Sequence, residues 1–210
     1  MPRKKTKSEE ELPKEKKTQE EKDPAVLAGL LDGLDSREVR SIALFGEVEE
    51  EKAADICFGL LLLSKLKPDE EKSGPIDFYI STYGGNADDM FSIFDMMDLA
   101  KKNCEVHTYG LGKVMSAGVL ILANGTPGKR KVAKHCRIML HSCNAGSVGD
   151  IHNMKNEMEQ IQHQQDEYIN ALVSVSSLTK RQLTRLLDRK VNVYLTAQEA
   201  IDYGIADEIM

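Results

Sequence analysis

The sequence predicts an α/β fold with a largely parallel sheet. Strand-like segments rich in alternating or β-branched apolar residues follow one another along most of the chain, and segments with helical apolar spacing separate them, as in consecutive βαβ units. Several strand-like segments end at glycine, where the chain can turn toward the next helix. A length of 210 residues allows one domain with a full core and an additional tail.

Residues 1–24 differ in composition from the rest. Eight of them are basic, seven are acidic, and only Met1 and Leu12 offer appreciable apolar surface. Such a segment cannot bury enough area to offset its ordering entropy. We therefore expect a disordered charged tail over 1–24 and a single folded domain over 25–210.

The overall charge and the cysteines limit the possible functions. A net charge of −6 argues against nucleic acid as a main partner. No apolar run approaches the ~18 residues of a membrane span, and no signal peptide opens the chain. The cysteines lack Cys-x-x-Cys spacing, which favours reduced thiols in the cytoplasm. The spacing of Cys136, His141 and Cys143 matches no standard zinc site, so no metal is expected.

The first part of the domain alternates helices and strands. Residues 25–34 have helical apolar spacing, and strands are predicted over 41–45 and 76–81. Between those strands a helix is predicted over 50–67, with an apolar stripe formed by Ala54, Cys57, Phe58, Leu61 and Leu62. After Gly84-Gly85, Asn86 can cap a helix whose apolar face comprises Met90, Ile93, Phe94 and Met97.

The next strand and helix flank Ser116. A strand is predicted over 105–109, and Gly110 and Gly112 then interrupt its pattern. Residues 117–123 are small or aliphatic on every face, which predicts a short buried helix. Ser116 therefore lies at a sharp strand-to-helix turn, where a hydroxyl can be held outward as a nucleophile. A simple helix-capping serine is the alternative.

The last part of the chain begins with a strand over 137–141. A long helix follows over 150–175, and its apolar residues have heptad spacing on an otherwise charged surface, which is typical of a projecting helix that packs against a partner. This heptad seam comprises Ile151, Met154, Met158, Ile161, Gln165, Tyr168 and Leu172. Helices over 179–187 and from Thr196 to Gly204 and an edge segment over 205–210 complete the domain.

Three chemically distinctive features follow predicted strands. They are Gly84-Gly85, Ser116 and His141, and the carboxyl ends of parallel strands meet at one edge of a sheet. A serine beside a histidine, with main-chain N–H groups available to a developing oxyanion, can perform acyl transfer. A turn, a capping serine and a strand-end histidine are the ordinary alternatives.

At these residues the chain resembles the Clp protease proteolytic subunit (ClpP) family. The strand and Gly-Gly motif of that family is similar to residues 79–86, its nucleophile turn to residues 115–118, and its Gly-(Glu/Lys)-Lys-Arg loop to residues 127–130. Its histidine strand is similar to residues 137–141 and its C-terminal motif to residues 195–204. The interval of 25 residues from Ser116 to His141 is also the family's spacing.

This resemblance implies a ClpP/crotonase-like spiral of βαβ units and a serine endopeptidase that cleaves unfolded polypeptides inside a chamber. It implies Ser116 as nucleophile, His141 as general base, and an oxyanion hole at the N–H groups of Gly85 and Ala117. Two stacked heptameric rings of identical chains would form through the helix over 150–175. The resemblance implies no cofactor in this chain, with ATP used only by a separate AAA+ unfoldase.

The chain also departs from the family pattern. The position of the catalytic aspartate holds Asn192, and Asp188 lies four residues earlier as an alternative third triad member. The tail over 1–24 does not resemble the apolar-tipped loops that contact the unfoldase. A catalytically weak or inactive ring subunit, a viral head-maturation protease of related fold and a crotonase-type acyl-CoA enzyme therefore remain alternatives, although the Ser116–His141 pair argues against the last.

Overall fold

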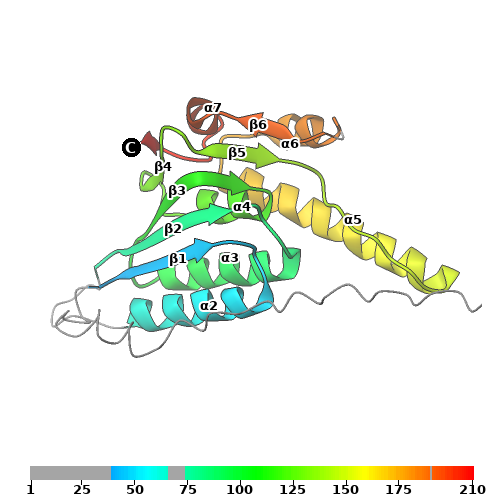
Figure 1. The fold of residues 1–210 in the computed structure, drawn as a ribbon, viewed down its shortest axis with the longest axis horizontal. Coiled ribbons are helices and arrows are strands. Elements are labelled where there is room, and N and C mark those ends of the chain that lie inside the picture. Colours follow the sequence, from blue (N-terminus) through cyan, green and yellow to red (C-terminus); the bar gives the residue numbers. More distant parts are fainter. Residues whose placement is uncertain (1–38, 66–73, 190) are drawn as a thin grey trace, which may run out of the picture. The chain divides into compact units, whose positions relative to one another are not determined.

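A seven-stranded, largely parallel sheet organises the described part of the chain (Figure 1). The computed structural model describes residues 39–65, 74–189 and 191–210. The tail predicted over 1–24, the helix predicted over 25–34 and the end of the helix predicted over 50–67 lie outside these ranges. The elements described below belong to one compact unit, Arg40–Met210.

The strand order confirms the predicted α/β class. Five strands lie in the order β1, β2, β3, β4 and β7, while β5 pairs with the second half of β3 and with β6. All of these pairs are parallel except that of β5 with β6. The strands are β1 (Ser41–Phe45), β2 (Ile76–Thr82), β3 (Val106–Met115), β4 (Arg130–Val132), β5 (Arg137–Leu140), β6 (Val193–Leu195) and β7 (Glu208–Ile209).

Strand β3 is longer than predicted. Its expected end before Gly110 is wrong, because the strand continues to Met115. Gly112 has a φ of 60°, and the register with β2 shifts between Ile80 and Thr82, so the glycines form an irregularity within the strand rather than its end. This irregularity separates the half of β3 that pairs with β4 from the half that pairs with β5.

Helices α2 and α3 lie together along one face of the sheet (Figure 1). Helix α4 follows β3 and is buried at every residue, as its uniformly apolar sequence predicts. Helix α5 extends away from the sheet. The bounds are α2 (Glu50–Lys65), α3 (Ala87–Lys101), α4 (Ala117–Ala123), α5 (Ile151–Ser174), α6 (Lys180–Leu187) and α7 (Ala197–Asp202). Within the described ranges, no helix has both the length and the apolarity to cross a membrane.

The apolar stripe predicted for α2 is not the face that the helix buries. The residues that α2 buries are Ala53, Ile56, Leu60 and Ser64, whereas Phe58 and Leu62 are 61% and 45% exposed. The helix carries apolar residues on two faces, and the periodicity alone did not show which face the sheet covers. Phe58 and Leu62 therefore leave an apolar surface on the single chain.

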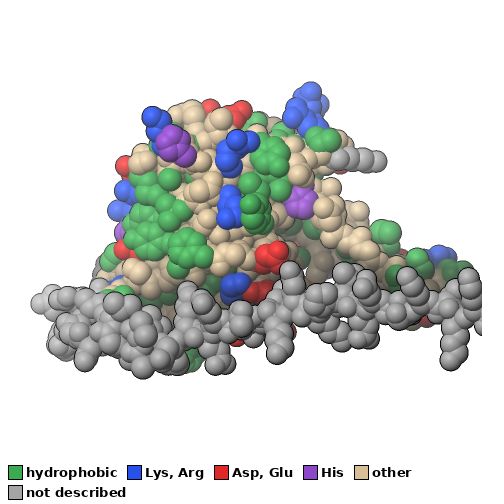
Figure 2. Space-filling model, viewed as in Figure 1, with side chains coloured by type: hydrophobic (Ala, Val, Ile, Leu, Met, Phe, Trp, Pro, Cys, Tyr) green, Lys and Arg blue, Asp and Glu red, His purple; other side chains and the backbone are tan. Residues whose placement is uncertain are grey.

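The opposite face of the sheet is partly open to solvent. Side chains alternate between buried and partly exposed along β2 and the first half of β3, which is the pattern of a sheet covered on one side. On the open face the rings of Tyr79 and Tyr109 stack with 4.9 Å between their centroids. Figure 2 shows hydrophobic side chains gathered over these strands, with lysine and arginine side chains beside them.

The two halves of α5 have different surroundings. Near the C-terminus, Tyr168, Ile169 and Leu172 are buried in the core. Near the N-terminus, apolar members of the heptad seam lie in solvent, and Ile151 and Met158 are 70% and 67% exposed. In the single chain, therefore, only the C-terminal half of the heptad seam on α5 is buried.

Candidate active site

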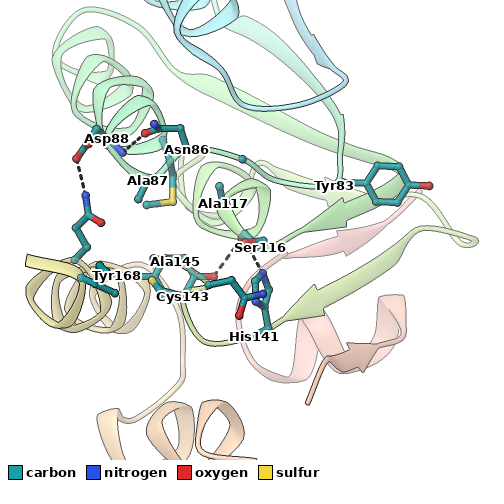
Figure 3. A pocket seen from close by; sticks show the side chains of 15 residues that line it. Tyr83, Asn86, Ala87, Asp88, Ser116, Ala117, His141, Cys143, Ala145 and Tyr168 are labelled. Atoms are coloured by element: carbon teal, nitrogen blue, oxygen red, sulfur yellow. Dashed lines mark hydrogen bonds between the residues drawn. The ribbon is translucent and has the colours of Figure 1, made fainter. Parts of the chain in front are cut away.

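The three chemically distinctive features meet at one edge of the sheet. Gly84-Gly85 follow β2, Ser116 follows β3, and His141 follows β5, and these strands are mutually parallel neighbours. Their carboxyl ends therefore point in the same direction, as expected for a site in an α/β fold. The structure brings Ser116 and His141 into direct contact (Figure 3).

Ser116 lies in a strained turn between β3 and α4. Its φ of 53° is the only positive φ among the described non-glycine residues. Its main-chain N–H donates to the carbonyl of Met139 at 2.8 Å, which holds the turn against β5. The hydroxyl forms no capping hydrogen bond to α4. An ordinary capping role therefore does not account for Ser116, and the strain, which costs of order 1–3 kcal/mol, is typical of functional turns.

The hydroxyl of Ser116 is instead directed at His141. Its Oγ lies 2.8 Å from Nε2 of His141, within the range of a hydrogen bond. In the neutral tautomer with a proton on Nδ1, Nε2 accepts the hydroxyl proton. This is the geometry that a general base requires for activating a serine nucleophile.

Gly84 and Gly85 permit the close approach of two other segments to this turn. A Cβ at Gly84, whose φ is 102°, would lie 2.6 Å from Cβ of Ser116. A Cβ at Gly85, whose φ is 155°, would lie 2.0 Å from the carbonyl oxygen of Val48. No side chain fits at either position, so Gly84 brings main chain against the serine and Gly85 packs against the main chain of Val48.

Two main-chain N–H groups next to Ser116 remain available. The N–H of Val48 donates to the carbonyl of Gly84, and the carbonyl of Val48 accepts from the N–H of Asn86. The N–H of Gly85, which lies between them in the sequence, takes no part in this bridge. Ala117 is the first residue of α4, and its N–H has no intrahelical acceptor. Neither N–H donates to any of the described residues. Both Gly85 and Ala117 line the cavity beside Ser116, where an oxyanion could accept from them.

Asn192 and His141 directly flank the last pair of the β5–β6 ladder. Leu140 pairs with Val193 at the end of the antiparallel ladder of β5 and β6, His141 is the next residue after β5, and Asn192 is the last residue before β6. Asp188, by contrast, is the C-cap of α6 and lines a neighbouring cavity, which shares Cys143 and Ile161 with the cavity beside Ser116 but is not lined by Ser116 or His141. No hydrogen bond joins either side chain to His141 within the described part of the chain.

Tyr168 is a site residue that the sequence did not identify as such. Its hydroxyl donates to the main-chain carbonyl of Ser116 at 3.3 Å (Figure 3). Burial, followed by the nearby Cys143, raises the pKa of Tyr168, so the hydroxyl stays protonated and remains a donor. The place of Tyr168 in the heptad seam predicted only that its ring packs against other apolar residues. No signal in the sequence indicated that its hydroxyl also contacts the turn at Ser116.

A cavity of about 420 Å³ opens beside the Ser116–His141 pair. It lies between the N-terminal end of α3 and the middle of α5, and His141, Ser116 and Tyr168 form its inner wall. Asp88 and Gln164 contribute to its opposite side, where Nε2 of Gln164 donates to Oδ1 of Asp88 at 2.8 Å. A peptide side chain next to the attacked carbonyl could enter this space.

The cysteines near the site are free thiols with unreactive surroundings. Burial raises the pKa of Cys136 to about 11 and also raises that of Cys143. Within the described ranges, no three His, Cys, Asp or Glu side chains are grouped so that they could hold a metal ion.

Comparison with known proteins connects this geometry to one family. The family model for Clp protease matches residues 34–210. The ATP-dependent Clp protease proteolytic subunit 1 of Corynebacterium jeikeium is 33% identical over 171 residues, which cover 81% of this chain and 87% of that protein. The ATP-dependent Clp protease proteolytic subunit 2 of Rhodococcus jostii is 34% identical over 171 residues, which cover 81% and 84%. The corresponding subunit 2 of Mycolicibacterium paratuberculosis is 33% identical over 173 residues, which cover 81% and 82%.

Proposed function

Because the chain belongs to the Clp protease family and is therefore a serine endopeptidase, we propose that Ser116, His141 and Asn192 carry its reaction. The fold is the crotonase-like α/β spiral of that family. The observation that supports the assignment best is the 2.8 Å contact between Oγ of Ser116 and Nε2 of His141 in a turn whose serine caps no helix. The substrate is a polypeptide chain in an unfolded, extended state.

The first half of the reaction acylates the serine. Nε2 of His141 takes the hydroxyl proton while Oγ of Ser116 attacks the peptide carbonyl carbon, and the carbonyl oxygen becomes an oxyanion. The N–H groups of Gly85 and Ala117 donate to that oxyanion. The imidazolium then gives its proton to the leaving amine, and the C–N bond breaks to leave an acyl-enzyme.

The second half releases the acyl group. A water molecule takes the place of the departed amine, and His141 accepts one of its protons as the water oxygen attacks the ester carbonyl. The oxyanion forms again at Gly85 and Ala117. Return of the proton to Oγ of Ser116 breaks the ester and restores the free enzyme.

Asn192 orients the imidazole in this proposal. The third residue of a serine triad accepts a hydrogen bond from Nδ1–H and so selects the tautomer whose Nε2 can act as base. The amide oxygen of Asn192 can accept that bond, but it supplies no negative charge for the imidazolium. Asn192 directly precedes β6 and His141 directly follows β5, next to the last pair of the ladder, Leu140 and Val193, and this supports Asn192 over Asp188 in the role.

We also propose a ring-shaped assembly of identical chains, formed by two stacked heptameric rings with the active sites inside. The exposed half of the heptad seam on α5 supports contacts between rings, because Ile151 and Met158 would otherwise remain in water. The apolar surface at Phe58 and Leu62 on α2 supports a second contact, between neighbours within a ring. The relatives are themselves named as subunits.

The proteolytic chain needs no cofactor in this proposal. The reaction uses only side chains and main-chain N–H groups, whereas the relatives are named ATP-dependent. ATP is then consumed by a separate partner, an AAA+ unfoldase that feeds the chamber. We propose that the protein acts in the cytoplasm together with such a partner.

A catalytically weak ring subunit is the second candidate. The observation that favours it is Asn192, which gives the proposed triad an amide in place of a carboxylate as its third member. Cleavage of a fluorogenic peptide by the purified protein separates the two candidates, with Ser116→Ala as the reference for background. Turnover that exceeds the background and disappears in Ser116→Ala supports the peptidase, and equal rates for the two proteins support the weak subunit.

A further inference from the structure

The wall of the active-site cavity opposite the serine has an unusual polar composition. Among the described residues that line the cavity, Asp88 is the only carboxylate and none is a lysine or an arginine. Asp88 comes from the first turn of α3 and Gln164 from the middle of α5, and the hydrogen bond between them spans that wall. Figure 3 shows Asp88 and the Ser116–His141 pair on different sides of the cavity.

The Asp88–Gln164 bridge offers hydrogen-bond acceptors that no cation of the described residues neutralises. No lysine or arginine of the described chain forms an ion pair with Asp88. Nε2 of Gln164 is used in the bridge, so its amide oxygen remains an acceptor next to the carboxylate. The pKa of the adjacent Asp89 is raised by burial first and then by Glu50 and Asp88, in keeping with unbalanced negative charge at this end of α3.

The rest of the cavity suits the stem of a long side chain. Ala87, Met90 and Ile161 supply apolar surface between the serine and the bridge. A lysine or arginine can lay its methylene groups along such surface and keep its charged end at a polar group. A guanidinium or an ammonium has only donors, which match the acceptors of the bridge.

We propose that this cavity binds the substrate side chain on the amino-terminal side of the cleaved bond, and that Asp88 selects lysine or arginine there. The inference rests on the proposed function, because it takes Ser116 as the residue that attacks the carbonyl. The carbonyl carbon must lie between Oγ of Ser116 and the N–H groups of Gly85 and Ala117. The side chain of that same residue then faces the space between α3 and α5.

A carboxylate at the start of a helix also has a structural use. The N-terminus of α3 favours acidic residues at Asp88 and Asp89 alike. Asp89 therefore provides a matched control, because it lies in the same helical turn and does not line the cavity. Asp88→Asn retains an oxygen that can accept from Gln164, so the bridge and the fold persist in the variant.

The test measures kcat/KM for three fluorogenic peptides that differ only at the residue before the cleaved bond, which is lysine, leucine or glutamate. We expect the assembled protein to prefer lysine over leucine, and Asp88→Asn to lower the lysine-to-leucine ratio about fivefold, the upper end for an exposed ion pair. Asp89→Asn should leave the ratio within about twofold. Asp88→Lys should make the glutamate peptide better than the lysine peptide.

The possible failures are distinguishable. If the protein cleaves leucine peptides through Ser116 but the ratio is the same in Asp88→Asn and Asp89→Asn, the inference is wrong and the proposed function stands. If no peptide is cleaved and no phosphonate reacts with Ser116, the proposed function is wrong and the inference falls with it. A preference for glutamate in the unmodified protein would overturn the inference alone.

Discussion

The hydroxyl of Tyr168 donates a hydrogen bond across 3.3 Å to the main-chain carbonyl of Ser116. Tyr168 belongs to the buried half of α5, whose other half exposes an unpartnered apolar seam. One helix therefore supports the strained turn of the nucleophile and also offers the surface for assembly. Contacts made by the exposed half can thus influence the geometry of the site.

Tyr168→Phe should reduce catalysis without disrupting the fold. The carbonyl of Ser116 still accepts from the N–H of Val119 at 3.0 Å, so it does not become unsatisfied. Loss of one neutral hydrogen bond should lower the free energy of unfolding by about 1 kcal/mol. We expect kcat to fall about threefold to tenfold with KM little changed, measured by steady-state peptide hydrolysis. If the folded variant keeps the original kcat, the hydroxyl has only a structural role.

Asn192→Asp should raise the turnover of small peptides. A carboxylate orients the imidazole as the amide does and in addition stabilises the imidazolium formed during attack. In the trypsin-like template the reverse change, from aspartate to asparagine, costs about 10⁴ in rate, chiefly through the wrong tautomer. A site built around asparagine avoids that part, so the expected gain here is smaller, about tenfold.

Asp188→Asn is the companion variant and should change turnover little. Asp188 caps α6 and lines a cavity to which neither Ser116 nor His141 contributes. If Asp188→Asn abolishes cleavage while Asn192→Ala does not, Asp188 is the third triad residue and the assignment of Asn192 is wrong.

Charged replacements on the exposed half of α5 should divide the assembly. Met158 is 67% exposed in the single chain, and Ile161 lies one turn further along the same seam. Placing glutamate at both positions would bury like charges against their counterparts from the facing ring. Light scattering should give a mass near fourteen chains for the unmodified protein and near seven for the double variant. A monomeric unmodified protein would contradict the proposed assembly.

The ion pair of Arg130 with Asp207 should make the free energy of unfolding depend on pH in the acidic range. Burial alone would raise the pKa of Asp207, but hydrogen bonds and charge attraction from Arg130 outweigh it and hold the pKa below the ordinary 3.8. Nε and Nη2 of Arg130 donate to the two carboxylate oxygens at 2.9 and 2.5 Å. Asp207→Asn leaves the arginine charge unpaired and should cost about 3 kcal/mol at pH 7.

The sign of the pH dependence follows from the lowered pKa. The folded state binds the Asp207 proton less tightly than the unfolded state, so this contribution is complete above pH 3.8 and is lost as pH falls through the folded-state value. In urea titrations, the free energy of unfolding of Asp207→Asn should therefore differ from that of the unmodified protein by a constant amount from pH 7 to about pH 5. The difference should shrink only in stronger acid. A difference that vanished already at pH 6 would point to another group.

The sequence predicted the core of the site although it placed the end of β3 too early. Gly84-Gly85 and His141 each follow a strand with a clear apolar pattern, and parallel neighbours align their carboxyl ends. The turn at Ser116 was also predictable, because a helix that is apolar all round has to begin there. These strand and helix patterns are local in the sequence, so they could be recognised without knowledge of the tertiary contacts.

The parts that were missed depend on tertiary contacts. β4 and β6 have three residues each, too few to show a periodicity, and their neighbours in the sheet stabilise them. The second apolar stripe of α2 was indistinguishable from the buried one without knowledge of which face meets the sheet. The bond from Tyr168 to Ser116 joins residues 52 positions apart, and no local pattern encodes it.

Covalent labelling of Ser116 tests the central claim most directly. A fluorophosphonate reacts with a serine hydroxyl only where a base and an oxyanion hole activate it. We expect mass spectrometry of the labelled, assembled protein to find one adduct, on the peptide that contains Ser116, and we expect none in Ser116→Ala and a large loss of labelling rate in His141→Ala. Labelling that persists in the Ser116→Ala protein, or an adduct on another residue, would contradict the account.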